Sequence, residues 1–587
     1  MVTLVNRLVR SRVSRSYAPK SSNERLVRNR LSTHPPPADL MVDDGLEDPP
    51  LPDDGEIVAR SRVLLGGWYG ATCVAVVGIS LCLRVFHLGT QSFWIDEINV
   101  TRLVRSGRVL SAVRDVDGPF EPPLHFLVVL VALKLPLGLE SAARVPAALF
   151  GTLEVLGLIL LAREATGRRL VAVIAGGLLA VAPFAVRYSQ ENRYYTMFSA
   201  LHLLTWWLLL RALRTRTLRS WLVYGALAAA MILTHPFAPL VLLVQAGVVL
   251  VAVLRARGRG RDVARSLVLG YSRGALLAIA LVLPWYSYGA TNWIRDAGKG
   301  NGFALNPPGA ITVPVGLGLF KGTAEWLLGN APVMTPLIAI LLVGISAAPF
   351  ICRGRARVVA ICALTYVLGF LLVLVPLARI MGTYFAFRRI EAFVAPLLLV
   401  VALTVVGVAD RLRSARVGRR TVFAVVAIGT LVVLAFSGVA TAKYYRSQKT
   451  NYRAFAEAVS TAPENVLVVV GPVDPRWVPS IEQYLRWYRV ATPVTFIVGG
   501  KPLPRLSVPE GGILWLTGAP PRVPGLQTRA LNDLGRMQII SGIIHSQQPT
   551  NYVLPWFASI SHPTTQSELD RQRDRVAKLP GMLMAIA

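Results

Sequence analysis

The chain has 587 residues, of which 53% are hydrophobic and only 16% are charged. A soluble protein is ordinarily about 45–50% apolar and about 25% charged, so this composition excludes a typical soluble enzyme. The net charge of +30 would indicate nucleic-acid binding in a soluble chain. Here the basic residues cluster in short loops between apolar runs, as in cytoplasmic loops, which argues against nucleic acid as a partner.

The first 60 residues are rich in Arg, then in Pro and Asp, and predict a disordered basic tail on the cytoplasmic side. The apolar runs that follow predict an α-helical polytopic membrane protein with about eleven transmembrane helices between residues 61 and 445. The expected spans are 64–86, 142–162, 171–186, 196–211, 221–235, 238–254, 267–288, 332–350, 358–377, 391–409 and 421–439.

The orientation depends on residues 124–135, an apolar stretch between Pro123 and Pro136. Twelve residues are too few for an ordinary crossing and favour an interfacial or re-entrant segment. If this segment does not cross, five Arg-rich loops fall on the cytoplasmic side, in keeping with the positive-inside rule. They are 163–169, 211–219, 255–265, 353–357 and 411–420. We therefore expect a cytoplasmic N-terminus and an extracytoplasmic C-terminus.

Two adjacent carboxylates, Asp96 and Glu97, follow the first span, directly after Phe93 and Trp94. Trp commonly marks the headgroup level of the bilayer, so the pair is expected at the outer rim of the membrane. As outer-face carboxylates, both are expected to contribute little to packing. A solvated loop would explain such a pair equally well if nothing accompanied it.

Arginines accompany it on the side that the charge rule disfavours. The external segment 187–195 contains Arg187 and Arg193, and the segment 379–389 contains Arg388 and Arg389. A lipid phosphate is a natural partner, because the guanidinium fork matches phosphate oxygens. Pairing with nearby acids such as Glu191 is the alternative.

The composition changes after residue 445. Residues 446–587 predict a small extracytoplasmic α/β domain, with helices near 452–459 and 480–488 and strands near 465–470, 494–498 and 512–516. This region shows no Gly-rich phosphate loop. The chain shows no tight metal-ligand spacing, so no cofactor is indicated, although a divalent metal stays open.

The motifs, taken in order, resemble a known family. They are Trp94-Ile95-Asp96-Glu97, Glu121-Pro122-Pro123-Leu124, Arg144-Val145-Pro146, the run from Tyr188 to Tyr195, and Thr234-His235-Pro236-Phe237. The chain is similar to the family 39-like bacterial glycosyltransferases of the GT-C superfamily, relatives of protein O-mannosyltransferases and of lipid A aminoarabinose transferases. The similarity covers roughly residues 64–410, and the family usually has His where this chain has Glu121.

The resemblance implies a multi-pass enzyme of the bacterial plasma membrane. Such an enzyme moves a sugar from a polyprenyl-phosphate donor to a glycan, lipid or protein acceptor, with inversion of the anomeric carbon. The catalytic external loop would be 87–140, with Asp96 as general base and Glu97 as its orienting partner or an alternate base. Donor-phosphate candidates are Arg193, Arg388 and Arg389, and acceptor-side candidates are Glu191, Glu121, His125 and Tyr194. His235, at a Pro-flanked turn, is more simply a structural cap than a ligand.

A lipid flippase or transporter without covalent chemistry is the rival interpretation, because such proteins also place carboxylates and arginines inside helical bundles. The charges singled out here lie at the outer face, and no inverted repeat with broken helices is evident. These features favour the enzyme.

Overall fold

The computed structural model describes most of the membrane domain and parts of the C-terminal region. The described residues are 67–107, 109–110, 122–258, 260–297, 334–380, 392–446, 453, 456, 460, 466–473, 478–491, 494–498, 513–518, 538–543 and 556–561. The expected tail 1–60, Glu121, Arg388 and Arg389 lie outside these residues.

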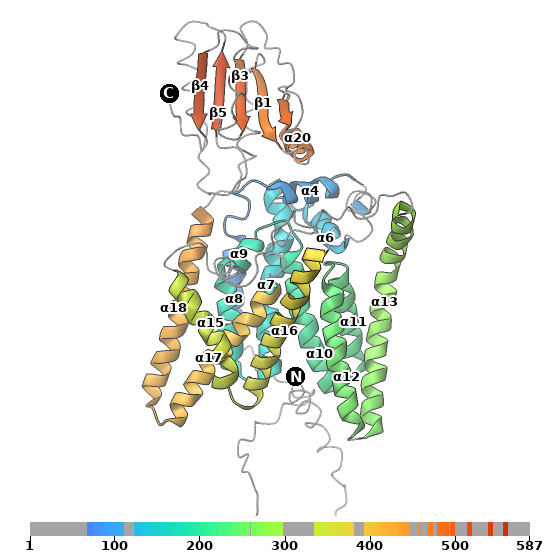
Figure 1. Ribbon diagram of the computed structural model, residues 1–587, viewed down its shortest axis with the longest axis vertical. Coiled ribbons are helices and arrows are strands. Elements are labelled where there is room, and N and C mark those ends of the chain that lie inside the picture. Colours follow the sequence, from blue (N-terminus) through green and yellow to red (C-terminus); the bar gives the residue numbers. More distant parts are fainter. Residues whose placement is uncertain are drawn as a thin grey trace, which may run out of the picture.

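Eight helices in the described part of the chain are long and apolar enough to cross a membrane. They are α3 (Trp68–Val85), α7 (Leu139–Thr166), α10 (Tyr195–Thr215), α12 (Ala238–Arg257), α13 (Arg261–Ala297), α16 (Gly354–Ile380), α17 (Val394–Ser414) and α18 (Arg419–Arg446). The protein is thus a helical polytopic membrane protein, and Figure 1 shows these helices running side by side in one bundle.

Three further helices fall where spans are expected. They are α8 (Arg169–Val181), α11 (Leu218–Ile232) and α15 (Met334–Ile351). The first two are apolar but shorter than a typical crossing, and the expected span 171–186 is interrupted before Pro183, where the short helix α9 (Pro183–Tyr188) begins. All eleven expected spans overlap a helix, while the count of eleven crossings stays a prediction.

Helices α7 and α10 pack along each other at the centre of the bundle, and the apolar core around α7 includes Val155, Leu158 and Leu203. Small residues allow other helices to approach closely. A Cβ atom on Gly225 of α11 would lie 2.2 Å from the carbonyl oxygen of Gly274 in α13, so these two backbones touch. Close contact through small residues is a common means of helix association in membranes.

Two short helices, α4 (Ile95–Val104) and α6 (Leu124–Ala132), lie across one end of the bundle. Helix α6 has nine residues and a length of about 14 Å, well short of the ~30 Å hydrocarbon core. It therefore cannot cross, in agreement with the prediction for residues 124–135. Its first backbone N–H, at Leu124, donates to the carbonyl of Leu233 at the end of α11 (2.9 Å).

The C-terminal region contains a five-stranded mixed sheet in the order β2-β1-β3-β5-β4. The strands are β1 (Val466–Val473), β2 (Val494–Val498), β3 (Ile513–Gly518), β4 (Gln538–Ile543) and β5 (Trp556–Ser561), with α20 (Val478–Trp487) between β1 and β2. Strand β1 pairs in parallel with β2 and β3, and β5 pairs antiparallel with β3 and β4. A single separate domain over 446–587 stays a prediction.

Candidate active site

The two acidic residues of the first external loop have different environments. Glu97 is the third residue of α4, and its Oε2 accepts a hydrogen bond from the backbone N–H of Trp94 (3.2 Å). This reach back to the N-cap residue is half of a capping box, and a carboxylate in the first turn also complements the helix dipole. The Glu97 side chain is completely buried.

Arg144 of α7 compensates the buried charge of Glu97. Its Nε donates to Oε1 and its Nη2 to Oε2, both at 2.8 Å, in a bidentate pair. The remaining guanidinium protons go to the backbone carbonyls of Leu88 (3.1 Å), Gln91 (2.7 Å) and Ser92 (3.1 Å). Arg144 is itself 1% exposed, so one buried cation organises the whole turn 88–92 before α4.

Asp96 precedes Glu97 in the same helical turn and is partly exposed. Successive residues of an α-helix diverge by about 100°, so a Glu97 side chain directed at Arg144 leaves Asp96 facing a different direction. The expectation that both carboxylates contribute little to packing is wrong for Glu97, because a fully buried bidentate ion pair cannot be removed without consequence. The buried, ion-paired Glu97 is thus suited to an orienting role, and the partly exposed Asp96 is suited to the role of base.

The second external segment, residues 189–195, joins the same cluster. The backbone N–H of Asn192 donates to Oε1 of Glu97 (2.7 Å), and the Asn192 side-chain amide donates to the Thr101 hydroxyl of α4 (3.1 Å). These two bonds fix residues 189–195 against α4. The predicted site residues Glu191, Arg193 and Tyr194 are thereby brought beside the acidic pair.

Glu191 is buried at 3% exposure, with the Nε of Arg187 3.7 Å from its Oε1. Burial, the largest single influence, lowers the pKa of Arg187, but Glu191 together with Tyr188 and Tyr444 outweighs it, so that the pKa is raised overall. This ion pair is the alternative considered for the basic segment 187–195, and it holds for Arg187. Arg193, in contrast, lies over the rings of Tyr194 and Tyr195, at 4.8 and 5.7 Å from their centroids.

His125 projects from the first turn of α6 and is 1% exposed, with its ring 6.0 Å from that of Tyr194. Burial, together with the positive charge of Arg193, lowers the pKa of His125 to about 3. The imidazole is therefore neutral at physiological pH and is suited to hold the segment 189–195 in place.

His235 has the structural role expected of it. Its Nδ1 accepts a hydrogen bond from the backbone N–H of Phe237 (3.0 Å), which closes the turn between α11 and α12. Its ring stacks on Phe198 at 4.3 Å between centroids. The prediction of a cap is confirmed.

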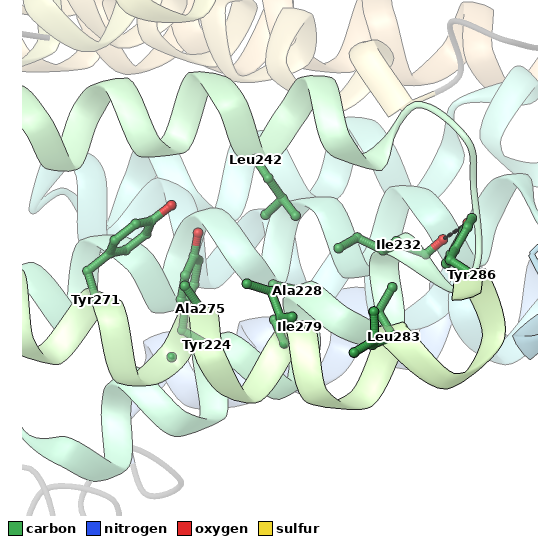
Figure 2. Close-up of a pocket in the computed structure, with 12 residues that line it drawn as sticks. Tyr224, Ala228, Ile232, Leu242, Tyr271, Ala275, Ile279, Leu283 and Tyr286 are labelled. Carbon is green, nitrogen blue, oxygen red and sulfur yellow. Dashed lines mark hydrogen bonds between the residues drawn. The ribbon is translucent and has the colours of Figure 1, made fainter. Parts of the chain in front are cut away.

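Two hollows in the bundle are apolar. A cavity of about 470 Å³ lies between the first turns of α12 and the middle of α16, and is lined by residues such as Leu240, Val244 and Phe370. A second groove of about 260 Å³ lies between α11 and α13 (Figure 2). Among the tyrosines that line this groove, the Tyr224 hydroxyl donates a hydrogen bond to Oε1 of Gln245 (2.9 Å), and the Tyr286 hydroxyl donates one to the backbone carbonyl of Ile232 (3.3 Å). Neither is lined by a charged residue, so both suit hydrocarbon chains.

The sequence interpretation gave no role to two residues that the structure makes central, Arg144 and Asn192. Arg144 could have been found from its position, because an Arg at the start of an apolar span calls for a buried partner. Asn192 contacts Glu97 through its backbone N–H, for which the sequence carries no signal. Among the described residues, no three His, Cys, Asp or Glu side chains group as metal ligands do.

Residues 120–288 match the family model described as dolichyl-phosphate-mannose-protein mannosyltransferase. The chain is similar to this mannosyltransferase family over that segment, which is less than a third of its length. The matched segment contains Arg144, His125 and the run from Glu191 to Tyr194, while Asp96 and Glu97 precede it.

Two solved structures of membrane enzymes match this chain at low sequence identity. ArnT from Cupriavidus metallidurans, bound to undecaprenyl phosphate, is 15% identical with a TM-score of 0.46, over 86% of this chain and 100% of that one. The oligosaccharyltransferase AglB from the archaeon Archaeoglobus fulgidus, in complex with an inhibitory peptide and a dolichol-phosphate, is 14% identical with a TM-score of 0.43. That match covers 74% of this chain and 64% of AglB. No curated protein matches the sequence.

Proposed function

We propose that this protein is a glycosyltransferase, which takes a sugar from a polyprenyl-phosphate-linked donor and transfers it to an acceptor hydroxyl on the extracytoplasmic side. The observation that carries the proposal is the division of labour in the acidic pair. Glu97 accepts hydrogen bonds from Arg144 and from the backbone N–H groups of Trp94 and Asn192. Asp96, on the same helical turn, is partly exposed. Glu97 thus fixes the first turn of α4, and the accessible carboxylate of Asp96 on that turn is suited to act as a general base.

In the proposed reaction, Asp96 accepts the proton of the acceptor hydroxyl as its oxygen attacks the anomeric carbon. The bond between that carbon and the phosphate oxygen breaks, and the lipid phosphate leaves with the bonding electrons. A single displacement of this kind inverts the anomeric configuration. A cation near the departing phosphate stabilises the charge that develops there.

Arg193 is the described candidate for that cation. Its guanidinium stacks over Tyr194 and Tyr195, from a segment whose Asn192 touches Glu97. Its Nη2 also lies within hydrogen-bonding distance of the Tyr194 hydroxyl (3.4 Å). An arginine stacked on aromatic rings is a common means of binding phosphate, because the planar guanidinium matches phosphate oxygens. Arg388 and Arg389 stay further candidates on sequence grounds, and Glu191, Glu121, His125 and Tyr194 stay candidates for the acceptor side.

The donor's hydrocarbon tail needs an apolar space between the helices of the bundle. The cavity between α12 and α16 meets this requirement in volume and in the character of its lining. The family description names a dolichyl-phosphate sugar, which is a donor of this class. We therefore assign the first isoprene units to this cavity.

Transfer by purified protein tests the proposal. The protein is reconstituted in lipid vesicles with a polyprenyl-phosphate sugar labelled in the sugar and with an extract of the cell envelope as acceptor. The proposal predicts labelled product outside the lipid fraction. A flippase would move the labelled donor between leaflets and leave every sugar on its lipid, and that result would overturn the proposal.

A further inference from the structure

Glu140, at the beginning of α7, accepts several hydrogen bonds from residues of the C-terminal region. Its Oε1 accepts hydrogen bonds from the Nε of Arg453 (2.9 Å), the hydroxyl of Tyr484 (2.7 Å) and the hydroxyl of Tyr488 (3.1 Å). The Nη2 of Arg453 lies 2.7 Å from the same oxygen. Burial and the Glu140 charge raise the pKa of Tyr488 to about 12 and raise that of Tyr484 as well, so both phenols keep the proton that they donate to Glu140.

Arg453 extends this cluster to the first external loop. Its Nη2 also donates to the backbone carbonyl of Gly89 (2.9 Å). Gly89 lies so close to α7 that a Cβ atom there would be 2.0 Å from the Ser141 hydroxyl. The backbone at Gly89 therefore packs closely against α7, and its carbonyl accepts a hydrogen bond from Arg453.

Apolar contacts run parallel to these polar ones. Helix α20 packs against α4, and the Phe93 ring meets Tyr484 and Trp487 edge-on, with centroids 6.3 and 6.2 Å apart. Figure 1 shows α20 lying next to α4, on the side away from the bundle. Buried side chains of α4 and α20, among them Ile98 and Ile481, belong to one apolar cluster.

Glu140 and Arg144 are four residues apart in α7 and so lie on one face of the helix. Arg144 holds Leu88, Gln91, Ser92 and Glu97, and Glu140 holds Arg453, which holds Gly89. The turn 88–92 is thus fixed from two directions, by the bundle and by the C-terminal region.

We propose that Glu140 is a positioning residue, which fastens Arg453, Tyr484 and Tyr488 of the C-terminal region onto the loop 88–97 and thereby sets the place of Asp96. This proposal rests on the proposed function, since it takes Asp96 as the reacting base. The C-terminal region then acts on catalysis without contacting substrate: it holds the loop that supplies the base. A shift of about 1 Å in a reacting group can lower turnover about a hundredfold.

Glu140→Gln tests the proposal in the full-length protein. The amide keeps the size of the side chain and one acceptor oxygen but loses the charge that pairs with Arg453. The matched control is Glu482→Gln, which removes an exposed pair with Arg486 (3.4 Å) on α20 itself. Two readouts are used: hydrogen exchange of the backbone amides of residues 88–104, and kcat separated from the KM for donor.

We expect Glu140→Gln to raise exchange in residues 88–104 while exchange in α10 and α17 is unchanged, and to lower kcat about ten- to a hundredfold with donor KM within about threefold. Arg453→Lys, which retains the charge without the fork that reaches both Glu140 and Gly89, should show the same pattern more weakly. Glu482→Gln should change neither readout. Unaltered exchange in 88–104, or a change spread evenly over the bundle, would overturn the proposal.

The two proposals fail separately. If the parental protein transfers no sugar, the proposed function is wrong, and the exchange measurement still decides whether Glu140 fixes the loop. If the parental protein transfers sugar and Glu140→Gln keeps both kcat and loop protection, only the positioning role is wrong. Should Glu140→Gln not fold, Arg453→Lys and Tyr484→Phe decide by the same readouts.

Discussion

The buried pair between Glu97 and Arg144 gives a sharp prediction about stability. Both side chains are at most 1% exposed and share two hydrogen bonds of 2.8 Å. Removing one partner of such a pair leaves an uncompensated buried charge, at a cost of about 3–5 kcal/mol. Arg144→Gln should destabilise the protein by this amount, because Glu97 then loses the cation that compensates its buried charge and keeps the hydrogen bonds from the backbone N–H groups of Trp94 and Asn192.

The double-mutant cycle separates the pair from its surroundings. In Glu97→Gln with Arg144→Gln neither position carries a charge, so the double variant should lose clearly less than the sum of the two single losses. Denaturant unfolding of the protein in detergent, followed by tryptophan fluorescence, supplies the free energies. Asp96→Asn, at a partly exposed position, and the surface variant Glu482→Gln should each change stability by no more than about 1 kcal/mol.

A loss for Glu97→Gln as small as that for Glu482→Gln would refute this reasoning. So would strictly additive losses in the cycle, since additivity means that the two side chains do not interact. Either result would return Glu97 to the solvated loop that the sequence alone allows.

Three more predictions concern pH, orientation and the donor. The pKa of His125 is about 3 when folded and 6.5 in a free chain, so the unfolded chain binds more protons between these values and stability falls as pH drops through that window. Between pH 7 and pH 5 the free energy of unfolding of the wild type should therefore fall by about 2 kcal/mol more than that of His125→Gln, as measured by denaturant unfolding at each pH. Equal losses in the two proteins would contradict the burial of His125. The orientation is tested with single cysteines in a variant that lacks the native cysteines. A Cys in place of exposed Leu137 should react with an impermeant thiol reagent from outside, and a Cys in place of exposed Arg257 only from inside. The reverse pattern would show that the orientation is inverted. Arg193→Gln should raise the donor Kd about 10- to 100-fold, the loss of one charge-assisted hydrogen bond, and an unchanged Kd would remove Arg193 from the donor site.

The membrane architecture could be predicted because it depends on properties that a sequence displays directly. Apolar runs near the length of the hydrocarbon core became α3, α7 and the other long helices. The short run between Pro123 and Pro136 became the nine-residue helix α6. Length and prolines are local signals, so no tertiary information was needed.

The interior of the site could be predicted only in part. Motifs singled out Asp96, Glu97 and the segment 188–195, and the structure brings them together. That Glu97 turns inward and Asp96 does not depends on Arg144, 47 residues further along, and on a backbone N–H of Asn192. The contact of Glu140 with Arg453, 313 residues away, leaves no local pattern at all.

Turnover of Asp96→Asn tests the central claim most directly. The amide keeps the shape of the side chain but cannot accept the proton of the acceptor hydroxyl, so donor Kd should be unchanged while the single-turnover rate of sugar transfer falls about 10²- to 10⁴-fold. Glu482→Gln serves as the control with parental rate. Transfer by Asp96→Asn at the parental rate would show that the base lies elsewhere and would contradict the account.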